Sequence, residues 1–202
     1  PDEETLEAIT HGTLYVMART QVLALHDNSG DGEYDHFEVV ATDFNARSRG
    51  IAMHFGLDSD PDGNLIFVNE SNVSRWSQKT QKSTPIAKGF RNGMGLATLP
   101  DGQILVAPQE GDWTPGSFIA KIREGEDYGF PGFGGKRDAK TPPMDVPFCY
   151  VPRGIDCSVG GIVPVTSDAW GPLSGKVIGL SYGYGSQYLL LTGDSGNQGA
   201  MG

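Results

Sequence analysis

The sequence has no long apolar run and no excess of basic residues. No segment approaches the roughly 18 consecutive apolar residues that mark a membrane-spanning helix, and no signal peptide opens the chain, as in a mature or truncated secreted protein. The 15 lysines and arginines are outnumbered by 25 aspartates and glutamates, which gives a formal charge of −10. Such a chain repels phosphate backbones and anionic lipid surfaces, and we find no local basic patch. The sequence therefore predicts neither a transmembrane segment nor a nucleic-acid partner.

Cysteine is scarce as well. The only two, Cys149 and Cys157, are close together in the sequence. In an oxidising compartment they could close a small disulfide loop. Two buried free thiols are the alternative.

Helical periodicity is confined to the opening segment, residues 1–9. Beyond it, short apolar or alternating runs are bounded by Gly, Asp, Asn or Pro, which is typical of β-strands separated by turns. The predicted strands are GTLYVM (12–17), QVLAL (21–25), FEVVAT (37–42), NLIFVN (64–69), QILVAP (103–108), SFIAKI (117–122), GKVIGLSY (175–182) and QYLLLT (187–192). Because no linker or low-complexity segment divides the chain, we expect residues 1–202 to form one all-β domain without an internal boundary.

One phrase is repeated. PDGNLIFV begins at Pro61 and PDGQILVA begins at Pro100, which is a spacing of 39 residues. In each copy Asp-Gly predicts a tight turn and the apolar run predicts a buried strand. A period near 40 residues indicates β-propeller blades of four strands, and an irregular β-sandwich is the structural alternative. Since a six-bladed propeller at about 40 residues per blade needs well over 202 residues, we expect the chain to cover part of a propeller.

A polar residue precedes each copy of the repeat. His54 stands in RGIAMHFGL ahead of the first copy, and Arg91 stands in FRNGMGL ahead of the second. Loops that lead into the inner strands of a propeller converge on its channel, so both side chains are predicted to face one ligand. The planar guanidinium of Arg91 suits a carboxylate or quinone oxygen. The alternatives are a hydrogen-bonded structural histidine and an arginine that forms salt bridges between blades.

Three segments carry a resemblance to a known family. HFGLDSDPDGNLIFV, GFRNGMGLATLPDGQILVAPQEGDW and GEDYGFPGF occur here in the order seen in PQQ-dependent sugar dehydrogenases of the glucose and sorbosone type, which include bacterial "membrane-bound dehydrogenase" propeller domains. The similarity covers most of the chain. It implies a propeller, six-bladed in full length, that oxidises a sugar or polyol and passes electrons to a cytochrome c. It also implies a periplasmic or secreted location.

The resemblance assigns a role to each motif. It implies that His54 is the general base, a task that suits a neutral imidazole near pH 7. It implies that Arg91 and Asn92 bind the PQQ cofactor. Gly111 and Asp112, in QEGDW, fall where backbone carbonyls hold Ca²⁺, a cation that accepts neutral oxygen ligands.

The sequence departs from the family at two places. Gly93 replaces the usual proline after Arg-Asn. Where the glucose enzyme supplies a lysine to the cofactor, this chain reads GLSYGYGSQYLLL and offers tyrosines. A cationic contact to the cofactor is therefore missing.

A second candidate calcium site lies in HDNSGDGEYDHFE. The spacing of its oxygen-bearing side chains is that of a calcium loop of the EF-hand type, with an alternative as a solvated acidic turn. Because QVLAL and FEVVAT flank it as strands, the loop would close a hairpin. The candidate positions 1, 3, 5, 6, 9 and 12 are Asp27, Ser29, Asp31, Gly32, Asp35 and Glu38.

Two other functions suit the same sequence. One is a propeller that binds carbohydrate or protein in its channel without catalysis. The other is a Ca²⁺-dependent propeller lyase or hydrolase that acts on sugars with His54 as the base.

Overall fold

The computed structural model describes residues 6–10, 13–18, 20–42, 55–69, 71–111, 114, 116–133, 135–193 and 198–201. Its strands form four antiparallel four-stranded sheets, each of which uses its strands in chain order. No helix in these ranges is long and apolar enough to cross a membrane. The expectation of an all-β chain is confirmed.

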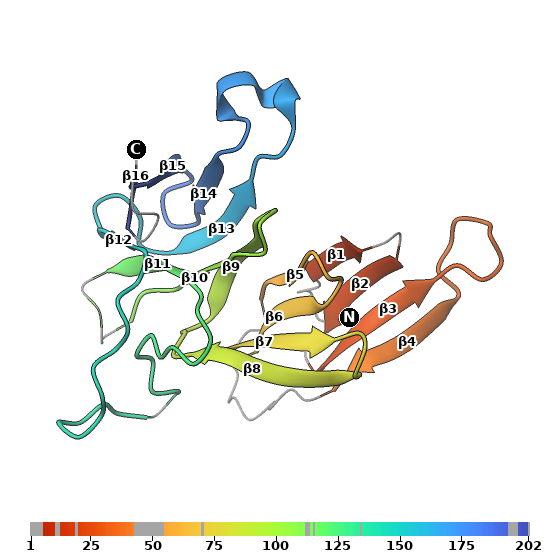
Figure 1. Ribbon diagram of the computed structural model, residues 1–202, viewed down its shortest axis with the longest axis horizontal. Helices are drawn as coiled ribbons and strands as arrows, with labels where there is room; N and C mark the ends of the chain where they lie inside the picture. The colour runs from red at the N-terminus through yellow and green to blue at the C-terminus, as the bar shows by residue number, and fades with distance from the viewer. Residues whose placement is uncertain are drawn as a thin grey trace.

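The sheets are here called blades 1 to 4 (Figure 1). Blade 1 contains β1 (Leu6–Thr10), β2 (Thr13–Ala18), β3 (Gln21–His26) and β4 (His36–Ala41). Blade 2 contains β5 (Leu57–Ser59), β6 (Leu65–Asn69), β7 (Asn72–Ser77) and β8 (Lys82–Lys88). Blade 3 contains β9 (Gly93–Thr98), β10 (Ile104–Pro108), β11 (Ser117–Lys121) and β12 (Cys149–Val151). Blade 4 contains β13 (Val159–Pro164), the 3₁₀ segment η1 (Asp168–Leu173), β14 (Val177–Ser181), β15 (Gln187–Thr192) and β16 (Gly199–Met201).

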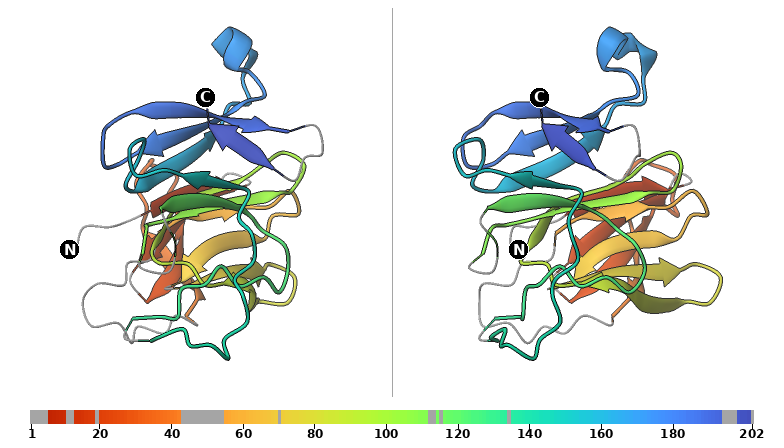
Figure 2. Two further views of the ribbon diagram at one scale, coloured as in Figure 1. Left: turned by 90° about the vertical axis from the view of Figure 1, so that its left-hand side faces the viewer. Right: turned by 60° about the vertical axis from the view of Figure 1, so that its left-hand side comes forward.

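The first strand of each blade is its inner strand. β5 contacts both β1 and β9, and β9 contacts β13, so the inner strands neighbour one another while the later strands extend outward (Figures 1 and 2). This arrangement is that of propeller blades and not of a two-layer sandwich. The chain is therefore a β-propeller with four blades among the described residues.

The eight strands predicted from apolar runs all exist. They correspond to β2, β3, β4, β6, β10, β11, β14 and β15. The helical periodicity of the opening segment was misleading, because Leu6–Thr10 is strand β1 and pairs with β2 along its whole length. Pairing with a neighbouring strand decides the conformation of this segment over its local pattern.

The hydrophobic core lies between the blades. On β6, Leu65 and Phe67 join a cluster shared with blade 1, while Ile66 and Val68 join a cluster shared with blade 3. Successive side chains of a strand point to opposite faces, so a strand covered on both sides is apolar throughout. A third cluster joins blades 3 and 4.

Glycine allows the inner strands to approach closely. A Cβ at Gly95 of β9 would lie 3.1 Å from both the Ala107 Cβ and the Ile162 Cγ1 atoms. A Cβ at Gly56 would lie 2.5 Å from the Leu96 Cβ. A side chain at Gly56 would therefore force blades 2 and 3 apart, and one at Gly95 would require its neighbours to shift slightly.

Each blade has two ends. Because β9 and β10 are antiparallel, with Gly93 paired to Pro108 and Thr98 to Ile104, the loop after β10 returns to the start of β9. We call this the loop end, and the opposite end, where the inner strands finish, the turn end. In blades 3 and 4 the loop end consists of residues 91–92, 109–111, 152–158 and 181–186.

The repeated PDG phrase forms the same turn in blades 2 and 3, at the turn end. In blade 2 the Asp60 N–H donates to the Asn64 carbonyl at 2.9 Å, and Gly63 has a φ of 80°. In blade 3 the Leu99 N–H donates to the Gln103 carbonyl at 2.8 Å, and Gly102 has a φ of 83°. The repeat read from the sequence is confirmed.

Candidate functional site

Arg91 and Asn92 lie at the loop end of blade 3, directly before β9. The half-buried Arg91 guanidinium donates to the backbone carbonyl of Glu110. The Asn92 side chain is buried and its Nδ2 donates to Gln109 Oε1 at 3.1 Å. The Gln109 N–H donates to the Arg91 carbonyl at 2.9 Å. The loop before β9 and the loop after β10 are thus held against each other.

These contacts bring the predicted residues Arg91, Asn92 and Gly111 together. Gly111 directly follows Glu110, and its carbonyl accepts a 3.4 Å bond from the Thr114 N–H. This place therefore offers both a charged hydrogen-bond donor, the Arg91 guanidinium, and neutral carbonyl oxygens.

Two predicted site residues, His54 and Asp112, lie outside the described residues. The chain after His54 is described from Phe55 onward. Gly56 packs so closely against Leu96 of β9 that a Cβ atom at this position would overlap the Leu96 side chain. The Gly56 carbonyl accepts a 3.1 Å bond from the Val68 N–H. The segment that follows His54 therefore runs beside the inner strand of blade 3.

Asp156, at the loop end of blade 4, is a residue that the sequence reasoning missed. Its side chain is 0% exposed. One carboxylate oxygen accepts from the Ser158 N–H at 2.9 Å and from the Ser181 hydroxyl at 2.8 Å. Its Oδ2 has no hydrogen-bond partner in the described part of the chain. RGIDCS precedes β13 as FRNG precedes β9, so a comparison of the segments before the inner strands would have drawn attention to Asp156.

Blades 3 and 4 are tied together at the loop end. Gln109 forms an isolated β-bridge with Ser158. The Arg153 Nε atom lies 3.0 Å from the Glu110 carboxylate. The Tyr184 hydroxyl donates to the Arg153 carbonyl at 3.1 Å. These contacts form a continuous path from the Arg91 loop to the turn between β14 and β15.

That β14–β15 turn carries two exposed tyrosines. Tyr182 is 74% exposed and Tyr184 is 60% exposed. These residues belong to the GLSYGYGS segment, where the family resemblance leads one to expect a lysine. The structure therefore places aromatic rings beside the predicted site.

The acidic loop between β3 and β4 folds around its own backbone. Asp27 accepts bonds from the Gly30 N–H at 2.6 Å and the Gly32 N–H at 2.8 Å. The bond from Gly32, with further bonds from Gly30 and Ser29, lowers the pKa of Asp27. Asp35 accepts from two backbone N–H groups of the same loop. The predicted strands on either side of the loop are confirmed.

Calcium binding by this loop stays a prediction. Glu38, at the last position of the proposed loop, lies 3.0 Å from His26 Nε2. Asp31 accepts a bond from the Glu33 N–H at 2.9 Å, which lowers its pKa. Over the ranges that the structure describes, no group of three or more His, Cys, Asp or Glu residues is placed to hold a metal ion. A carboxylate that accepts backbone N–H bonds keeps lone pairs for a cation, so these bonds are compatible with the prediction.

Both cysteines are free thiols. Cys149 belongs to the core between blades 3 and 4, and burial raises the pKa of its thiol to about 11. Cys157 is half-buried at the loop end. The free-thiol alternative therefore describes this chain, with only one of the two thiols fully buried.

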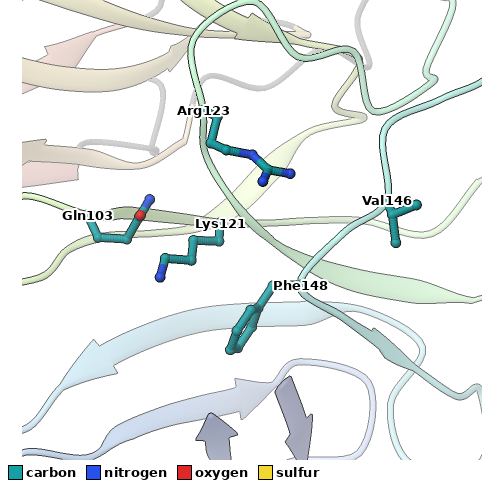
Figure 3. Close-up of a pocket in the computed structure, with 5 residues that line it drawn as sticks. All are labelled: Gln103, Lys121, Arg123, Val146 and Phe148. Carbon is teal, nitrogen blue, oxygen red and sulfur yellow. The ribbon is translucent and has the colours of Figure 1, made fainter. Parts of the chain in front are cut away.

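Three cavities lined by described residues lie at the turn end, away from Arg91 and Asp156. The largest, about 420 Å³, lies between the PDG turn of blade 3 and the segment around η1. A second, about 370 Å³, lies beside Arg75 and Glu124. The third, about 140 Å³, is the smallest of the three. Figure 3 shows its lining residues, Gln103, Lys121, Arg123, Val146 and Phe148.

No protein-family model and no curated protein matches the sequence. Solved structures match its fold. The soluble aldose sugar dehydrogenase from Escherichia coli, in its apo form, matches with a TM-score of 0.69 and 15% identity over 98% of this chain. The PQQ-bound aldose sugar dehydrogenase from Streptomyces coelicolor matches with a TM-score of 0.65 and 13% identity over 93% of this chain. This chain has the fold of these sugar dehydrogenases.

A third match is the calcium structure of a family AA12 carbohydrate-active enzyme from Trichoderma reesei, with a TM-score of 0.63 and 17% identity over 96% of this chain. The chain spans 66% of the E. coli protein, 60% of the S. coelicolor protein and 66% of the T. reesei protein. At these identities the matches establish the fold. Activity has to be argued from the residues at the loop end.

Proposed function

We propose that the protein is an oxidoreductase that oxidises a sugar or polyol at the loop end, with a PQQ-type quinone and Ca²⁺ as cofactors. The observation that carries the proposal is the contact of Arg91 with the Glu110 carbonyl, next to Gly111. It supports a site in which a guanidinium and neutral backbone oxygens meet, as an anionic quinone and a bound cation require. The fold shared with sugar dehydrogenases supports the same assignment.

In this proposal each residue has a distinct task. A bound quinone would supply the electron acceptor for oxidation of a sugar hydroxyl. Arg91 donates hydrogen bonds to an anionic ligand oxygen. Asn92, through its bond to Gln109, fixes the position of the Arg91 loop. The backbone carbonyl oxygens of Gly111 and Asp112 are the candidate ligands for Ca²⁺.

His54 is proposed as the general base. A neutral imidazole can take the proton of the sugar hydroxyl as the hydroxyl-bearing carbon is oxidised. The course of the chain from Phe55, beside β9, supports a position near the Arg91 loop. A cytochrome c acceptor and a periplasmic or secreted location are parts of the same proposal.

The test is His54→Ala in the protein reconstituted with PQQ and Ca²⁺. Aldose-dependent reduction of an artificial electron acceptor should fall by about 10²–10⁴-fold, with an unchanged circular dichroism spectrum and melting temperature. The matched control is His36→Ala, because His36 is an exposed histidine on β4 of blade 1. It should retain full activity.

Other outcomes would redirect the assignment. Activity that survives in His54→Ala would remove His54 from the reaction. Sugar binding without turnover in the wild type would favour the non-catalytic binding propeller. Release of an unsaturated sugar product would favour the Ca²⁺-dependent lyase.

A further inference from the structure

We propose that the turn between β14 and β15 is a platform for the ring of a neutral sugar, formed by Tyr182 and Tyr184 and positioned by Asp156. This inference rests on the proposed function, because it locates the substrate at the same loop end. It names the substrate class and adds residues that neither the motifs nor the fold assign.

The two tyrosines are exposed on a turn that is firmly held. The Ser181 N–H donates to the Ser186 carbonyl at 2.8 Å, which closes the turn. The Tyr182 N–H donates to the Ser158 carbonyl at 2.9 Å. The Tyr184 hydroxyl is fixed to the Arg153 carbonyl at 3.1 Å. An exposed aromatic ring that is held in place, as the Tyr184 ring is, loses little conformational entropy on binding, so it suits a ligand surface.

Asp156 fixes this turn through a hydrogen bond to Ser181. Its carboxylate accepts from the Ser181 hydroxyl, and the Ser181 Oγ atom accepts in turn from the Tyr184 N–H at 3.0 Å. A buried carboxylate with one oxygen unpartnered among the described residues is a costly arrangement, which calls for a functional explanation. Because Asp156 is 0% exposed, it cannot touch the ligand and acts through Ser181 as a positioning residue.

The platform lies next to the proposed reaction site. Ser158 joins the two, since it is bridged to Gln109 on one side and bonded to Tyr182 on the other. Gln109 in turn contacts Arg91 and Asn92. A ligand that rests on the tyrosines therefore lies beside the Arg91 loop.

The chemistry of this surface favours an uncharged ring. Two cations, Arg91 and Arg153, are matched here by two anions, Glu110 and Asp156, and Arg153 is already paired with Glu110. Without bound Ca²⁺, these groups carry no net positive charge that would attract a uronate. The C–H face of a sugar ring packs well on the electron-rich face of a tyrosine, and its hydroxyls remain available to polar groups at the rim.

The test measures binding without any quinone or Ca²⁺, so that it is independent of redox activity and of the charge of the bound cation. D-Glucose, D-galactose, sorbitol and D-glucuronate are titrated into the protein by isothermal calorimetry. We expect a neutral sugar to bind more tightly than glucuronate, and Tyr182→Ala to weaken that binding by about tenfold. The control is Tyr150→Ala, because Tyr150 is an exposed tyrosine on β12. It should bind as the wild type does.

The positioning role has its own readout. Ser181→Ala should raise the Kd for the sugar and, in the reconstituted enzyme, raise KM with little change in kcat. Ser181→Thr keeps a hydroxyl for Asp156 and should restore both values. A loss of affinity in Ser181→Ala that Ser181→Thr does not restore would overturn the role of Asp156.

Different results would contradict the platform and the proposed function. If Tyr182→Ala weakens sugar binding but the wild type never turns over sugar, the platform stands and the oxidoreductase proposal falls. If sugar is oxidised but Tyr182→Ala changes neither Kd nor KM, the platform falls alone. Absence of binding of any neutral sugar to the wild type, or tighter binding of glucuronate, would also overturn the platform.

Discussion

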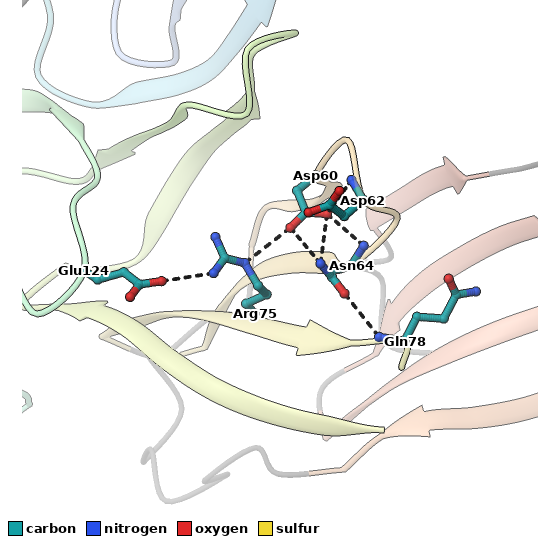
Figure 4. Close-up of polar contacts among 6 residues, drawn as sticks. All are labelled: Asp60, Asp62, Asn64, Arg75, Gln78 and Glu124. Carbon is teal, nitrogen blue, oxygen red and sulfur yellow. Dashed lines mark hydrogen bonds and ion pairs between the residues drawn. The ribbon is translucent and has the colours of Figure 1, made fainter. Parts of the chain in front are cut away.

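The two ends of the blades differ in how completely a carboxylate shielded from solvent is hydrogen-bonded. At the turn end of blade 2, Asp60 accepts bonds from the Asp62 N–H at 3.1 Å and from the Asn64 N–H at 2.9 Å, and it forms an ion pair with Arg75 (Figure 4). At the loop end of blade 4, Asp156 has one oxygen without a partner among the described residues. Both oxygens of the turn-end carboxylate thus fix the chain, while one oxygen of the loop-end carboxylate is unpartnered in the described part of the chain. Proteins depart from local optimisation in this way where they bind ligands.

At the turn end, an ion pair also connects neighbouring blades. Arg75 of blade 2, which holds Asp60, donates to Glu124 of blade 3 at 3.1 Å (Figure 4). The corresponding tie at the loop end is the pair between Arg153 and Glu110. The comparison predicts that substitutions at the loop end change function and that substitutions at the turn end change stability.

The largest expected effect is that of Arg91→Gln at the loop end. Loss of the guanidinium removes a charge-assisted donor to the ligand, and turnover should fall by about 10²–10³-fold. The melting temperature should change little, since a glutamine amide can still donate to the Glu110 carbonyl. Steady-state kinetics and thermal melts on one preparation check both statements. A variant with a clearly lower melting temperature and the wild-type specific activity would contradict this assignment of roles to the two ends.

At the turn end, Asp60→Ala should lower the free energy of unfolding by about 2–3 kcal/mol, because hydrogen bonds to a buried charged group are lost together. Its kcat should stay at the wild-type value. Urea denaturation measures the loss. The neighbouring Asp62→Ala is the matched control, since Asp62 is exposed on the same turn, and it should cost less than about 0.5 kcal/mol. Equal losses in the two variants would contradict the account of this turn.

The two cysteine thiols should differ in reactivity. Cys149 lies in the core between blades, and at pH 8 a pKa of about 11 leaves about one thiolate in a thousand. Cys157 lies at the loop end and is more accessible. Iodoacetamide should therefore modify Cys157 at least about tenfold faster than Cys149 in the native protein, as mass spectrometry of peptides would show. Faster modification of Cys149 would contradict this account, because it would mean that the core between blades 3 and 4 opens to the reagent.

The smallest effect concerns the acidic loop of blade 1. If the loop binds calcium, chelation should lower the melting temperature by a few degrees, because a ligand that binds only the native state stabilises it. The double substitution Asp27→Ala and Asp31→Ala should abolish this sensitivity. A wild-type melting curve indifferent to chelator would exclude a stabilising calcium ion at either proposed site.

The strands that could be predicted from sequence are those with an apolar or alternating run between turn residues. The second strand of every blade was predicted, because β2, β6, β10 and β14 are apolar runs between turns. The inner strands β5, β9 and β13 were not, since they are short or rich in glycine where blades meet closely. The outer strand β8 was missed because KSTPIAK contains no such run, whereas β4, which is likewise exposed, was predicted from FEVVAT.

The candidate site was predictable only within one blade. Arg91, Asn92 and Gly111 stand in one repeat unit, and the turn between β9 and β10 brings them together. Asp156 and Ser181 meet across a separation of 25 residues, and neither RGIDCS nor GLSYGYGS by itself predicts that contact. Their contact forms only once the strands of blade 4 pair.

The most direct test of the central claim is a titration of the apoprotein with PQQ in the presence of Ca²⁺, followed by quenching of intrinsic fluorescence. If the loop end is the ligand site, the wild type and Asp60→Ala should bind PQQ equally well, and Arg91→Gln should bind it at least about tenfold more weakly. Equal affinity in all three proteins, or a selective loss in Asp60→Ala, would contradict the assignment of the ligand site to the loop end.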